Sequence, residues 1–551
     1  MDFLTIISFV GFTALVAIIA WYATRNTDEK SADGYFLGGR SLGAITIAGS
    51  LLLTNLSAEQ IVGLNGQAFS EGIMVMAWET LAAIAMILGA LFLLPKYMRS
   101  GITTIPEFIE TRFDANTKSL LSILFLFAYG IVLLPTILYS GSLAFSTLFD
   151  LPTALGISEW SVIWLCVWVI GAIGIVYAIF GGLKAVAVSD LINAIGLLIG
   201  GLLIPIFGLM LIGDNSISNG LNVLWESNPE KFDMVGAVDS SIPFSTVFTG
   251  MMIAQMYYWG TNQSILQRVF AAKSLKEGQK GMLFAAFVKF LIPVIVVLPG
   301  IIAWHYFDGQ LANPDQAYPA LVKEVLPGAF VGFFAAVLFG AVLSSFNSLL
   351  NSSATLFGFD LFKQFFNNEA TELQRVKAGK NFGLGLGLIS MTIAPFIIFA
   401  PDGLFSYIQQ SLGSMSVPIL AVVLVGMFTK KVPAIAAKTV MIGGVLTYLT
   451  SLLFLEPMFR GNALAEAESN GITDAAQLSI LEAQAYPHFL HIMGIIFAIS
   501  IIYMLIMGKV RPQQTPYEPT ITEAIDVTPW KYAMVVSIII TILVLSTYFI
   551  F

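Results

Sequence analysis

Runs of about twenty apolar residues, repeated along almost the whole chain, constrain the fold more than any other feature of this sequence. The hydrocarbon core of a bilayer is about 30 Å thick, so a helix that rises 1.5 Å per residue needs roughly 20 apolar residues to cross it. Fourteen such runs are predicted, at residues 4–22, 42–66, 73–95, 119–148, 159–180, 185–212, 243–263, 281–304, 326–356, 381–400, 404–427, 433–455, 487–507 and 529–550. The sequence therefore predicts an all-α polytopic membrane protein with 14 transmembrane helices.

The composition excludes several other classes of protein. Of the 551 residues, 57% are hydrophobic and 11% are charged, whereas soluble domains average about 45–50% and 25%. The net charge of −8 is the opposite of a nucleic-acid-binding surface. One cysteine, Cys166, and three scattered histidines provide neither a disulfide framework nor a metal site of those residues. We therefore expect membrane lipid as the surroundings, no nucleic-acid partner and no obligatory protein partner.

Lysine and arginine are concentrated in alternate loops between the predicted spans. Loops after odd-numbered spans, counted together with the adjoining ends of the spans, hold 22 of the 26 basic residues, and loops after even-numbered spans hold three. Cytoplasmic loops of membrane proteins carry such an excess of basic residues. The distribution predicts a multi-pass protein of the cell membrane whose two termini both lie outside the cytoplasm.

Among the ionisable side chains within the predicted spans, four are candidates for function: Glu59, Glu79, Asp190 and Lys289. A charged side chain in hydrocarbon costs at least about 2.5–3.5 kcal/mol, so such residues indicate function by default. The alternative for each is a buried ion pair, or a carboxylate at a helix end with access to water.

The second span has a polar segment near its centre, TNLSAEQ at residues 54–60. Threonine, asparagine and serine compete for backbone hydrogen bonds and weaken a helix locally. Unwound backbone at this depth is tolerated where it lines a cavity, and discontinuous helices form the binding sites of many secondary transporters. We expect span two to be unwound here, with a continuous polar helix as the alternative.

Span nine places Ala341, Ser344 and Ser345 on one helical face, because they occupy positions i, i+3 and i+4. Two hydroxyl oxygens then lie beside a backbone carbonyl, which is the kind of ligand that a hard cation such as Na⁺ requires. The alternative is that the serines only allow close helix packing.

Span seven carries Gln255 and Tyr258, which share a helical face. Further groups of the same kind stand in other spans, namely Trp78, Glu79, Lys289 and Gln409. Carboxylate, amide and ammonium groups can bond sugar hydroxyls, and aromatic rings can cover the apolar faces of a sugar. The alternative for the aromatic residues is an interfacial belt or core packing.

Seven segments resemble a known family, in the same order along residues 35 to about 430. They are YFLGGRSL (35–42), TNLSAEQIVGL (54–64), IPEFIETRF (105–113), GGLKA (181–185), YYWGTNQSILQRVFAAKS (257–274), FAAFVKFLIPVIVVLPG (284–300) and VLSSFNSLLNSSATLFGFDLFK (342–363). Together they resemble the sodium/solute symporter family, and within it most of all the bacterial sodium–galactose and sodium–glucose cotransporters.

The resemblance implies a LeuT-type core of two inverted five-helix repeats. The chain would then divide into an N-terminal span with its cytoplasmic loop (1–41), a first repeat (42–212), an outer loop (213–242), a second repeat (243–427) and three C-terminal spans (428–551) with an outer loop at 456–486, which can form a surface helix. The implied activity is import of a sugar by alternating access, coupled to Na⁺, and no enzymatic activity.

The same resemblance implies three groups of site residues. The Na⁺ site would use the carbonyls of Leu53, Leu56 and Ala341 and the hydroxyls of Ser344 and Ser345. The sugar site would use Asn55, Ser57, Gln60, Glu79, Gln255, Lys289 and Gln409, with Trp78 at its wall and Tyr258, backed by Trp259, closing it from the inside. A second Na⁺ site, found in some relatives, would use Asp190, Asn347 and Ser348.

The sequence departs from the galactose transporters at three pocket positions. Gln255 replaces asparagine, Trp78 replaces tyrosine and Ala82 replaces serine, so the identity of the sugar stays open. Asn347 replaces a hydroxyl residue, which leaves open whether one or two Na⁺ ions move. Other solutes, namely a uronate, sialic acid or myo-inositol, remain the main alternative, ahead of a membrane enzyme or a sensor.

Overall fold

The computed structural model describes residues 3–25, 37–311, 313–399, 404–519 and 525–550. Almost all regular structure in these ranges is helical, and the described residues form only two isolated β-bridges, Leu42 with Ala272 and Ser274 with Asp526. Most of the loop expected after span one, and residues 35–36 of the first family-like segment, lie outside the described residues. The all-α prediction is confirmed.

The helices of the first half are α1 (Phe3–Thr24), α3 (Ala44–Asn55), α4 (Ala58–Glu71), α5 (Ala77–Leu88), α6 (Leu94–Ser100), α7 (Ile105–Arg112), α8 (Ala115–Phe127), α9 (Leu134–Leu148), α10 (Leu151–Leu155), α11 (Glu159–Ile212) and α12 (Ile217–Ser227). The helices of the second half are α13 (Gly250–Gly260), α14 (Gln263–Phe270), α15 (Leu275–Lys289), α16 (Ile292–Val296), α17 (Leu298–Tyr306), α18 (Ala317–Val325), α19 (Gly328–Thr355), α20 (Lys363–Phe365), α21 (Glu372–Ile393), α22 (Leu404–Phe428), α23 (Ala434–Thr450), α24 (Glu456–Ser469), α25 (Ala475–Ala485), α26 (Phe489–Val510) and α27 (Ala533–Ile550). Short 3₁₀ and π turns join or extend them: η1 (Gly38–Arg40), η2 (Ile73–Met76), η3 (Gly89–Leu93), η4 (Ala128–Leu133), η5 (Pro229–Phe232), η6 (Phe244–Phe248), η7 (Pro314–Gln316), η8 (Leu356–Phe362), η9 (Ala394–Phe399) and η10 (Ser451–Leu455).

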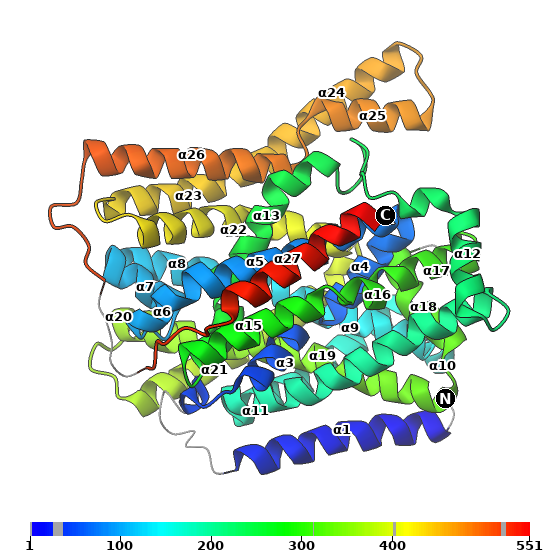
Figure 1. Ribbon diagram of the computed structural model, residues 1–551, viewed down its shortest axis with the longest axis horizontal. Helices are drawn as coiled ribbons and strands as arrows, with labels where there is room; N and C mark the ends of the chain where they lie inside the picture. Colours follow the sequence, from blue (N-terminus) through cyan, green and yellow to red (C-terminus); the bar gives the residue numbers. More distant parts are fainter. Residues whose placement is uncertain (1–2, 26–36, 312, 400–403, 520–524, 551) are drawn as a thin grey trace.

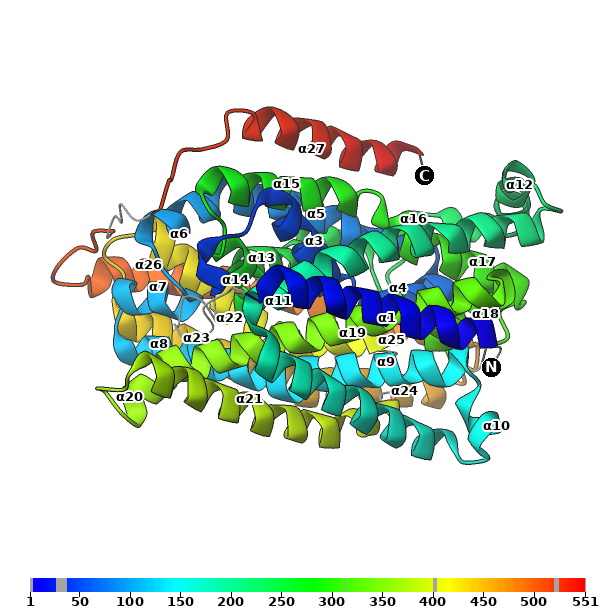
Figure 2. The same cartoon turned by 90° about the horizontal axis from the view of Figure 1, so that it is seen from below.

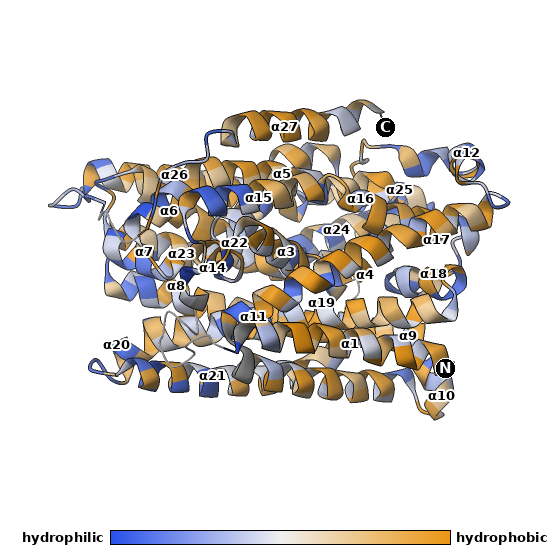
Figure 3. Ribbon diagram, turned by 60° about the horizontal axis from the view of Figure 1, so that its bottom comes forward, coloured by the Kyte–Doolittle hydropathy of each residue, from blue (hydrophilic) through white to orange (hydrophobic). Residues whose placement is uncertain are grey.

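The long helices run roughly along one direction and form a bundle (Figures 1 and 2). Apolar residues dominate the shafts of these helices, and hydrophilic residues are more frequent toward the two ends of the bundle (Figure 3). The start of α1 and the end of α27 both point toward the end of the bundle that carries α10 and α12. This arrangement agrees with an even number of crossings.

Ten described helical segments are long and apolar enough to cross a membrane, and two bent helix pairs bring the number to twelve. The two remaining predicted runs, 243–263 and 529–550, correspond to helices that are short: α13 has 11 residues and α27 has 18. The structure therefore supports a polytopic architecture with ten to twelve candidate spans, rather than fourteen equivalent long helices.

Span two is broken within the predicted polar segment 54–60, and the break is shorter than that segment. Helix α3 continues to Asn55 and α4 begins at Ala58, so only Leu56 and Ser57 depart from helical backbone, and the two helices are bent by 56°. The N–H of Leu56 donates to the carbonyl of Leu52 and closes the last turn of α3. Because helix ends leave backbone groups without intrahelical partners, this break presents free carbonyls and N–H groups within the bundle.

Span eight is also bent, a feature that the sequence analysis did not predict. Helix α15 ends at Lys289, and α16 and α17 continue the span after a 47° bend. Pro293 lies in the first turn of α16 and Pro299 in the first turn of α17. Proline lacks the N–H that would bond the preceding turn, so these residues account for the interruption.

The outer segments contain short helices at the edge of the bundle. In the loop predicted at 456–486, α24 and α25 pack on each other and project from the bundle (Figure 1). The surface helix predicted there is thus found as two helices. The other predicted outer loop, 213–242, contains α12 and η5.

Candidate solute and sodium site

A buried cavity lies where the break of span two faces α5, α13, α15 and α22. Its internal volume is about 80 Å³. Most of the predicted sugar-site residues line it, namely Asn55, Gln60, Trp78, Glu79, Gln255, Tyr258, Lys289 and Gln409. Ligand cavities of proteins commonly combine apolar walls with a few convergent polar groups in this way.

Lys289 and Glu79 form a buried ion pair at the centre of this polar cluster. The Lys289 ammonium lies 2.5 Å from Glu79 Oε2, and the two side chains are 0% and 1% exposed. Lys289 also donates to the side-chain oxygen of Asn55, and Gln60 donates to Glu79 Oε1 at 2.6 Å. The four residues come from α15, α5, α3 and α4, so the pair joins both bent spans to span three.

The helix ends favour the positions of these two charges. Glu79 lies in the first turn of α5 and Lys289 in the last turn of α15. A helix macrodipole stabilises a carboxylate near its N-terminus and a cation near its C-terminus. The pair therefore sits where the backbone field supports both charges.

The amide of Gln255 is fixed by protein groups on both sides. Its Nε2 donates to the carbonyl of Trp78 at 2.9 Å, and its Oε1 accepts from Trp259 Nε1 at 3.2 Å. Trp259 is fully buried behind Gln255 and packs against Tyr258, with the ring centroids 5.2 Å apart. Trp259 thus supports the cavity wall from behind.

The predicted residue Ser57 lies in the break of span two but is not part of the cavity surface. Its side chain is fully buried, and its hydroxyl donates to the backbone carbonyl of Asn55 at 3.4 Å. The structure therefore places Ser57 as a support for the two-residue break, while Asn55 next to it reaches the cavity.

Four polar atoms of residues that line the cavity are buried and form no hydrogen bond with any described residue: Glu59 Oε2, Trp78 Nε1, Thr54 Oγ1 and Tyr257 Oη. A buried polar group without a partner costs about 1–3 kcal/mol, so a bound hydroxylated solute could relieve this cost. Glu59 and Thr54 were absent from the predicted sugar site. The signal for Glu59 was present in the sequence, since it is an ionisable residue within a span.

The residues of the predicted Na⁺ site lie together at the break of span two. Leu53, Leu56, Ala341, Ser344 and Ser345 are all buried, and α19 packs against both α3 and α4. The hydroxyl of Ser345 donates to the carbonyl of Thr54 at 3.2 Å, which joins the serine face of α19 to the last turn of α3. These oxygens suit a hard cation, and the ligand set itself stays a prediction.

The residues predicted for a second Na⁺ site lie one turn further along α19 and on α11. Asp190 Oδ2 accepts from Ser50 at 2.6 Å, and Ser348 donates to the carbonyl of Ser344 at 2.5 Å. The side-chain amide of Asn347 has no hydrogen-bond partner among the described residues. An arginine that the prediction did not include, Arg268, also donates to the Ser348 hydroxyl.

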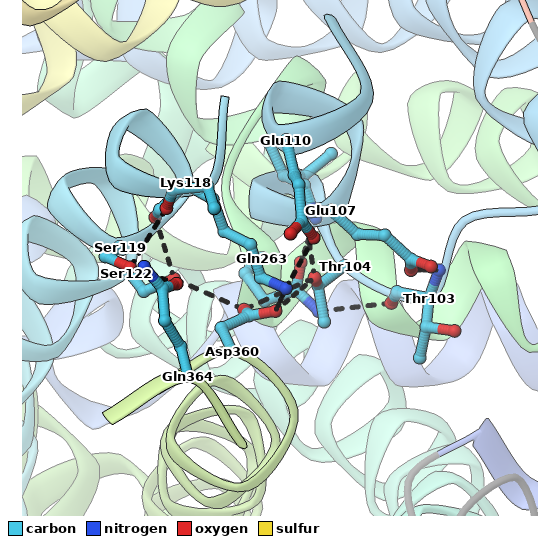
Figure 4. A network of polar contacts seen from close by, with 12 residues as sticks. Thr103, Thr104, Glu107, Glu110, Lys118, Ser119, Ser122, Gln263, Asp360 and Gln364 are labelled. Carbon is cyan, nitrogen blue, oxygen red and sulfur yellow. Dashed lines mark hydrogen bonds and ion pairs between the residues drawn. The ribbon is translucent and has the colours of Figure 1, made fainter. Parts of the chain in front are cut away.

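A separate polar network lies away from the cavity, at the junction of α7, α8 and η8 (Figure 4). Lys118 contacts Glu110 at 2.7 Å and the buried Asp360 at 3.4 Å. Asp360 also accepts from Ser122 at 3.2 Å and from Thr104. The network is a structural junction between three helical segments, because each of its charges has a partner.

The comparisons with known proteins identify the family. A family model described as the sodium:solute symporter family matches residues 35–444. The chain belongs to this family. It is therefore a multi-pass membrane transporter and not an enzyme, and its family couples solute transport to Na⁺.

Individual relatives support this assignment along most of the symporter. It is 43% identical over 548 residues to an uncharacterized symporter, YidK, of Escherichia coli (strain K12), which covers 100% of this chain and 91% of that protein. It is 34% identical over 484 residues to the sodium/glucose cotransporter of Vibrio parahaemolyticus, covering 83% and 86% of the two chains.

A solved structure shows the same fold. The substrate-bound outward-open state of a Na⁺-coupled sialic acid symporter matches with a TM-score of 0.71 and 19% identity, over 94% of this chain and 99% of that chain. The likeness at this level of identity concerns the arrangement of helices and not the solute.

Proposed function

We propose that this symporter imports a neutral monosaccharide of the galactose or glucose type, driven by Na⁺ and by alternating access. The observation that carries the proposal is the cavity around the Lys289–Glu79 pair, where amide, carboxylate and ammonium groups converge beside the ring of Trp78. The sodium/glucose cotransporter of Vibrio parahaemolyticus, at 34% identity, is a relative named for a sugar of this class.

The proposed ion site lies against the proposed sugar site. Na⁺ would be bound by the carbonyls of Leu53, Leu56 and Ala341 and by the hydroxyls of Ser344 and Ser345. Asn55 borders the same break, and its side chain lines the proposed sugar cavity. An ion that holds the break in one conformation therefore also holds a sugar-binding group in place. Binding of the two ligands is then reciprocal, as thermodynamic linkage requires.

The wider architecture in this proposal has fourteen spans and both termini outside the cytoplasm. Residues 42–212 and 243–427 would form two inverted repeats of the LeuT type, with 1–41, the outer loop 213–242 and 428–551 outside the core. The 22-to-3 distribution of basic residues supports the orientation. Bent helix pairs at the binding site are typical of such transporters.

Acidic solutes fit the cavity less well than neutral ones. The Lys289 ammonium is already paired with Glu79 at 2.5 Å, and the carboxylate of Glu59 lines the same cavity. A uronate or sialic acid would bring a further negative charge beside these groups. myo-Inositol has the same neutral polyhydroxyl chemistry as a sugar, and a mouse relative at 29% identity is named sodium/myo-inositol cotransporter 2. It is the second candidate solute.

Uptake into proteoliposomes tests the proposal. Vesicles with purified protein receive labelled galactose, glucose, myo-inositol, glucuronate or sialic acid under an inward Na⁺ gradient, with an equal choline gradient as control. We expect accumulation of a neutral hexose with Na⁺ only. Accumulation of an acidic solute without any neutral one would overturn the sugar assignment, and equal uptake in choline would overturn the coupling.

A further inference from the structure

The structure assigns a role to Arg268, a residue of α14 that the sequence places next to a cytoplasmic loop. Its side chain is fully buried, although arginine is almost never buried without partners. Arg268 Nε donates to the hydroxyl of Ser50 at 2.9 Å, and its two terminal nitrogens donate to the Ser348 hydroxyl and to the carbonyl of Ser264. One guanidinium therefore connects α14 with α3 and α19.

The carboxylate of Asp190 is the counter-charge of Arg268, and the hydroxyl of Ser50 bridges the two groups. Asp190 on α11 accepts from the Ser50 hydroxyl at 2.6 Å and interacts electrostatically with Arg268. Gly49 allows this approach, because a Cβ at that position would lie 2.6 Å from the side chain of Leu191. The close packing of α3 on α11 thus brings Ser50 between a buried carboxylate and a buried guanidinium.

This layer of four residues lies next to the proposed Na⁺ site. Ser50 precedes Leu53 by one turn on α3, and Ser348 follows Ser344 by one turn on α19. With the proposed orientation, both serines lie on the cytoplasmic side of the ion. Ser344 Oγ, close to the Asp190 carboxylate, makes no hydrogen bond of normal geometry with a described residue.

Arg268 is also linked to the solute cavity. Ser264 lines the cavity, and its carbonyl accepts from Arg268 one turn further along the same short helix. Helix α14 directly follows α13, which carries Gln255 and Tyr258. A movement of α13 and α14 around bound solute would therefore move the guanidinium relative to Ser50 and Ser348.

We propose that Arg268 is the cytoplasmic-side gate for the coupling ion. While its guanidinium bonds Ser50 and Ser348, a fixed positive charge and two occupied hydroxyls separate the Na⁺ site from the cytoplasm. When α14 moves with the solute site, the guanidinium leaves these hydroxyls and opens the way from the Na⁺ site toward the cytoplasm. Arg268 acts here as a positioning residue, and the inference rests on the proposed Na⁺ coupling.

Tracer Na⁺ efflux from solute-free proteoliposomes tests this role. We expect Arg268→Gln to accelerate efflux by about ten-fold or more, a change that corresponds to about 1.4 kcal/mol. Arg268→Lys keeps the charge but loses the fork of donors, so its efflux should be intermediate. In Arg268→Gln, the number of Na⁺ ions moved per solute should rise above the wild-type ratio. The solute affinity of this variant at saturating Na⁺ should stay within about three-fold of the wild type, which corresponds to less than about 0.7 kcal/mol.

Arg112→Gln is the matched control. Arg112 is an equally buried guanidinium, and it donates to the carbonyls of Gly426 at 2.9 Å and Val432 at 3.2 Å, in a different part of the structure. Its variant should show the efflux of the wild type even where its thermal stability falls. A structural effect of losing any buried arginine would instead affect both variants.

A second variant covers the case in which Arg268→Gln fails to fold. Ser50→Ala combined with Ser348→Ala removes the two hydroxyl acceptors and leaves the guanidinium in place, and its efflux should also exceed the wild-type rate. Wild-type efflux and ratio in a folded variant of either kind would overturn the inference. The efflux assay contains no solute, so its result does not depend on the sugar assignment. Absence of Na⁺-stimulated solute uptake in the wild type would instead overturn the proposed function.

Discussion

Removing only one of the two buried charges, Lys289 or Glu79, should destabilise the protein much more than removing both. The two side chains are 0% and 1% exposed and lie 2.5 Å apart. Removing one partner of a buried pair costs about 3–5 kcal/mol, because the other charge stays buried and unpaired. We expect this loss in the free energy of unfolding for Lys289→Met and for Glu79→Gln. The double variant should lose less than either single variant.

Denaturant titration of the detergent-purified protein measures these free energies, with the double-mutant cycle giving the coupling between the two sites. Lys280→Met on the same helix is the control, since Lys280 pairs with Glu277 at 3.3 Å and both side chains are about one-third exposed. That exposed pair should contribute at most about 1 kcal/mol. Additive losses at Lys289 and Glu79 would refute the reasoning.

The same three variants separate folding from transport. Both residues line the proposed sugar cavity, so the double variant should recover stability without recovering uptake. Recovery of uptake together with stability would mean that the pair serves the fold alone and does not contact the solute.

Three further outcomes are expected. Ser345→Ala should raise the Na⁺ concentration for half-maximal uptake by about ten-fold, since a lost ligand leaves a buried partner unsatisfied at about 1–3 kcal/mol; unchanged Na⁺ dependence in this variant and in Ser344→Ala would contradict the ion site. Tyr258→Ala should lower sugar accumulation, measured by uptake, more than it lowers the affinity for Na⁺, measured by calorimetry without sugar. Equal losses in accumulation and in Na⁺ affinity would contradict the role of Tyr258 as a gate. Burial raises the pKa of Asp315 to about 6, and this carboxylate accepts from the Leu404 N–H at 3.0 Å. Its native pKa exceeds the unfolded value, so the wild type should lose about 3 kcal/mol as pH rises from 4 to above 6. Asp315→Asn keeps a hydrogen-bond acceptor without the charge, so its thermal stability relative to the wild type should rise between pH 4.5 and 7.5. A difference in stability that does not depend on pH would argue against this account.

The sequence located the broken span correctly, and the break is shorter than the polar segment that predicted it. The polar residues at 54–60 indicated where the helix is weak, and the structure places the break inside that segment. Hydrogen bonding at the end of α3 keeps Thr54 and Asn55 helical, and α4 starts at Ala58, so only two residues depart from the helix. Polarity reports a tendency to unwind, whereas packing and helix-end hydrogen bonds decide how far it goes.

Pairing across the bundle was beyond the reach of the sequence pattern. Glu79 and Lys289 were both identified as intramembrane charges, but their contact joins residues 210 positions apart and depends on how the helices pack. Arg268 was counted among basic loop residues, while the structure buries it completely. Composition places a residue near a membrane surface, and only the fold shows whether its side chain points into the protein.

The internal neutralisation of Lys289 by Glu79 has an electrical consequence. Because this pair stays in the protein and a neutral sugar brings no charge, the full charge of each Na⁺ would cross the membrane field in one cycle. One charge moving through 100 mV is worth about 2.3 kcal/mol, which corresponds to about 40-fold accumulation of solute at 1.4 kcal/mol per ten-fold. Transport would then appear as a current, and depolarising the membrane would release stored sugar even at constant Na⁺ concentrations.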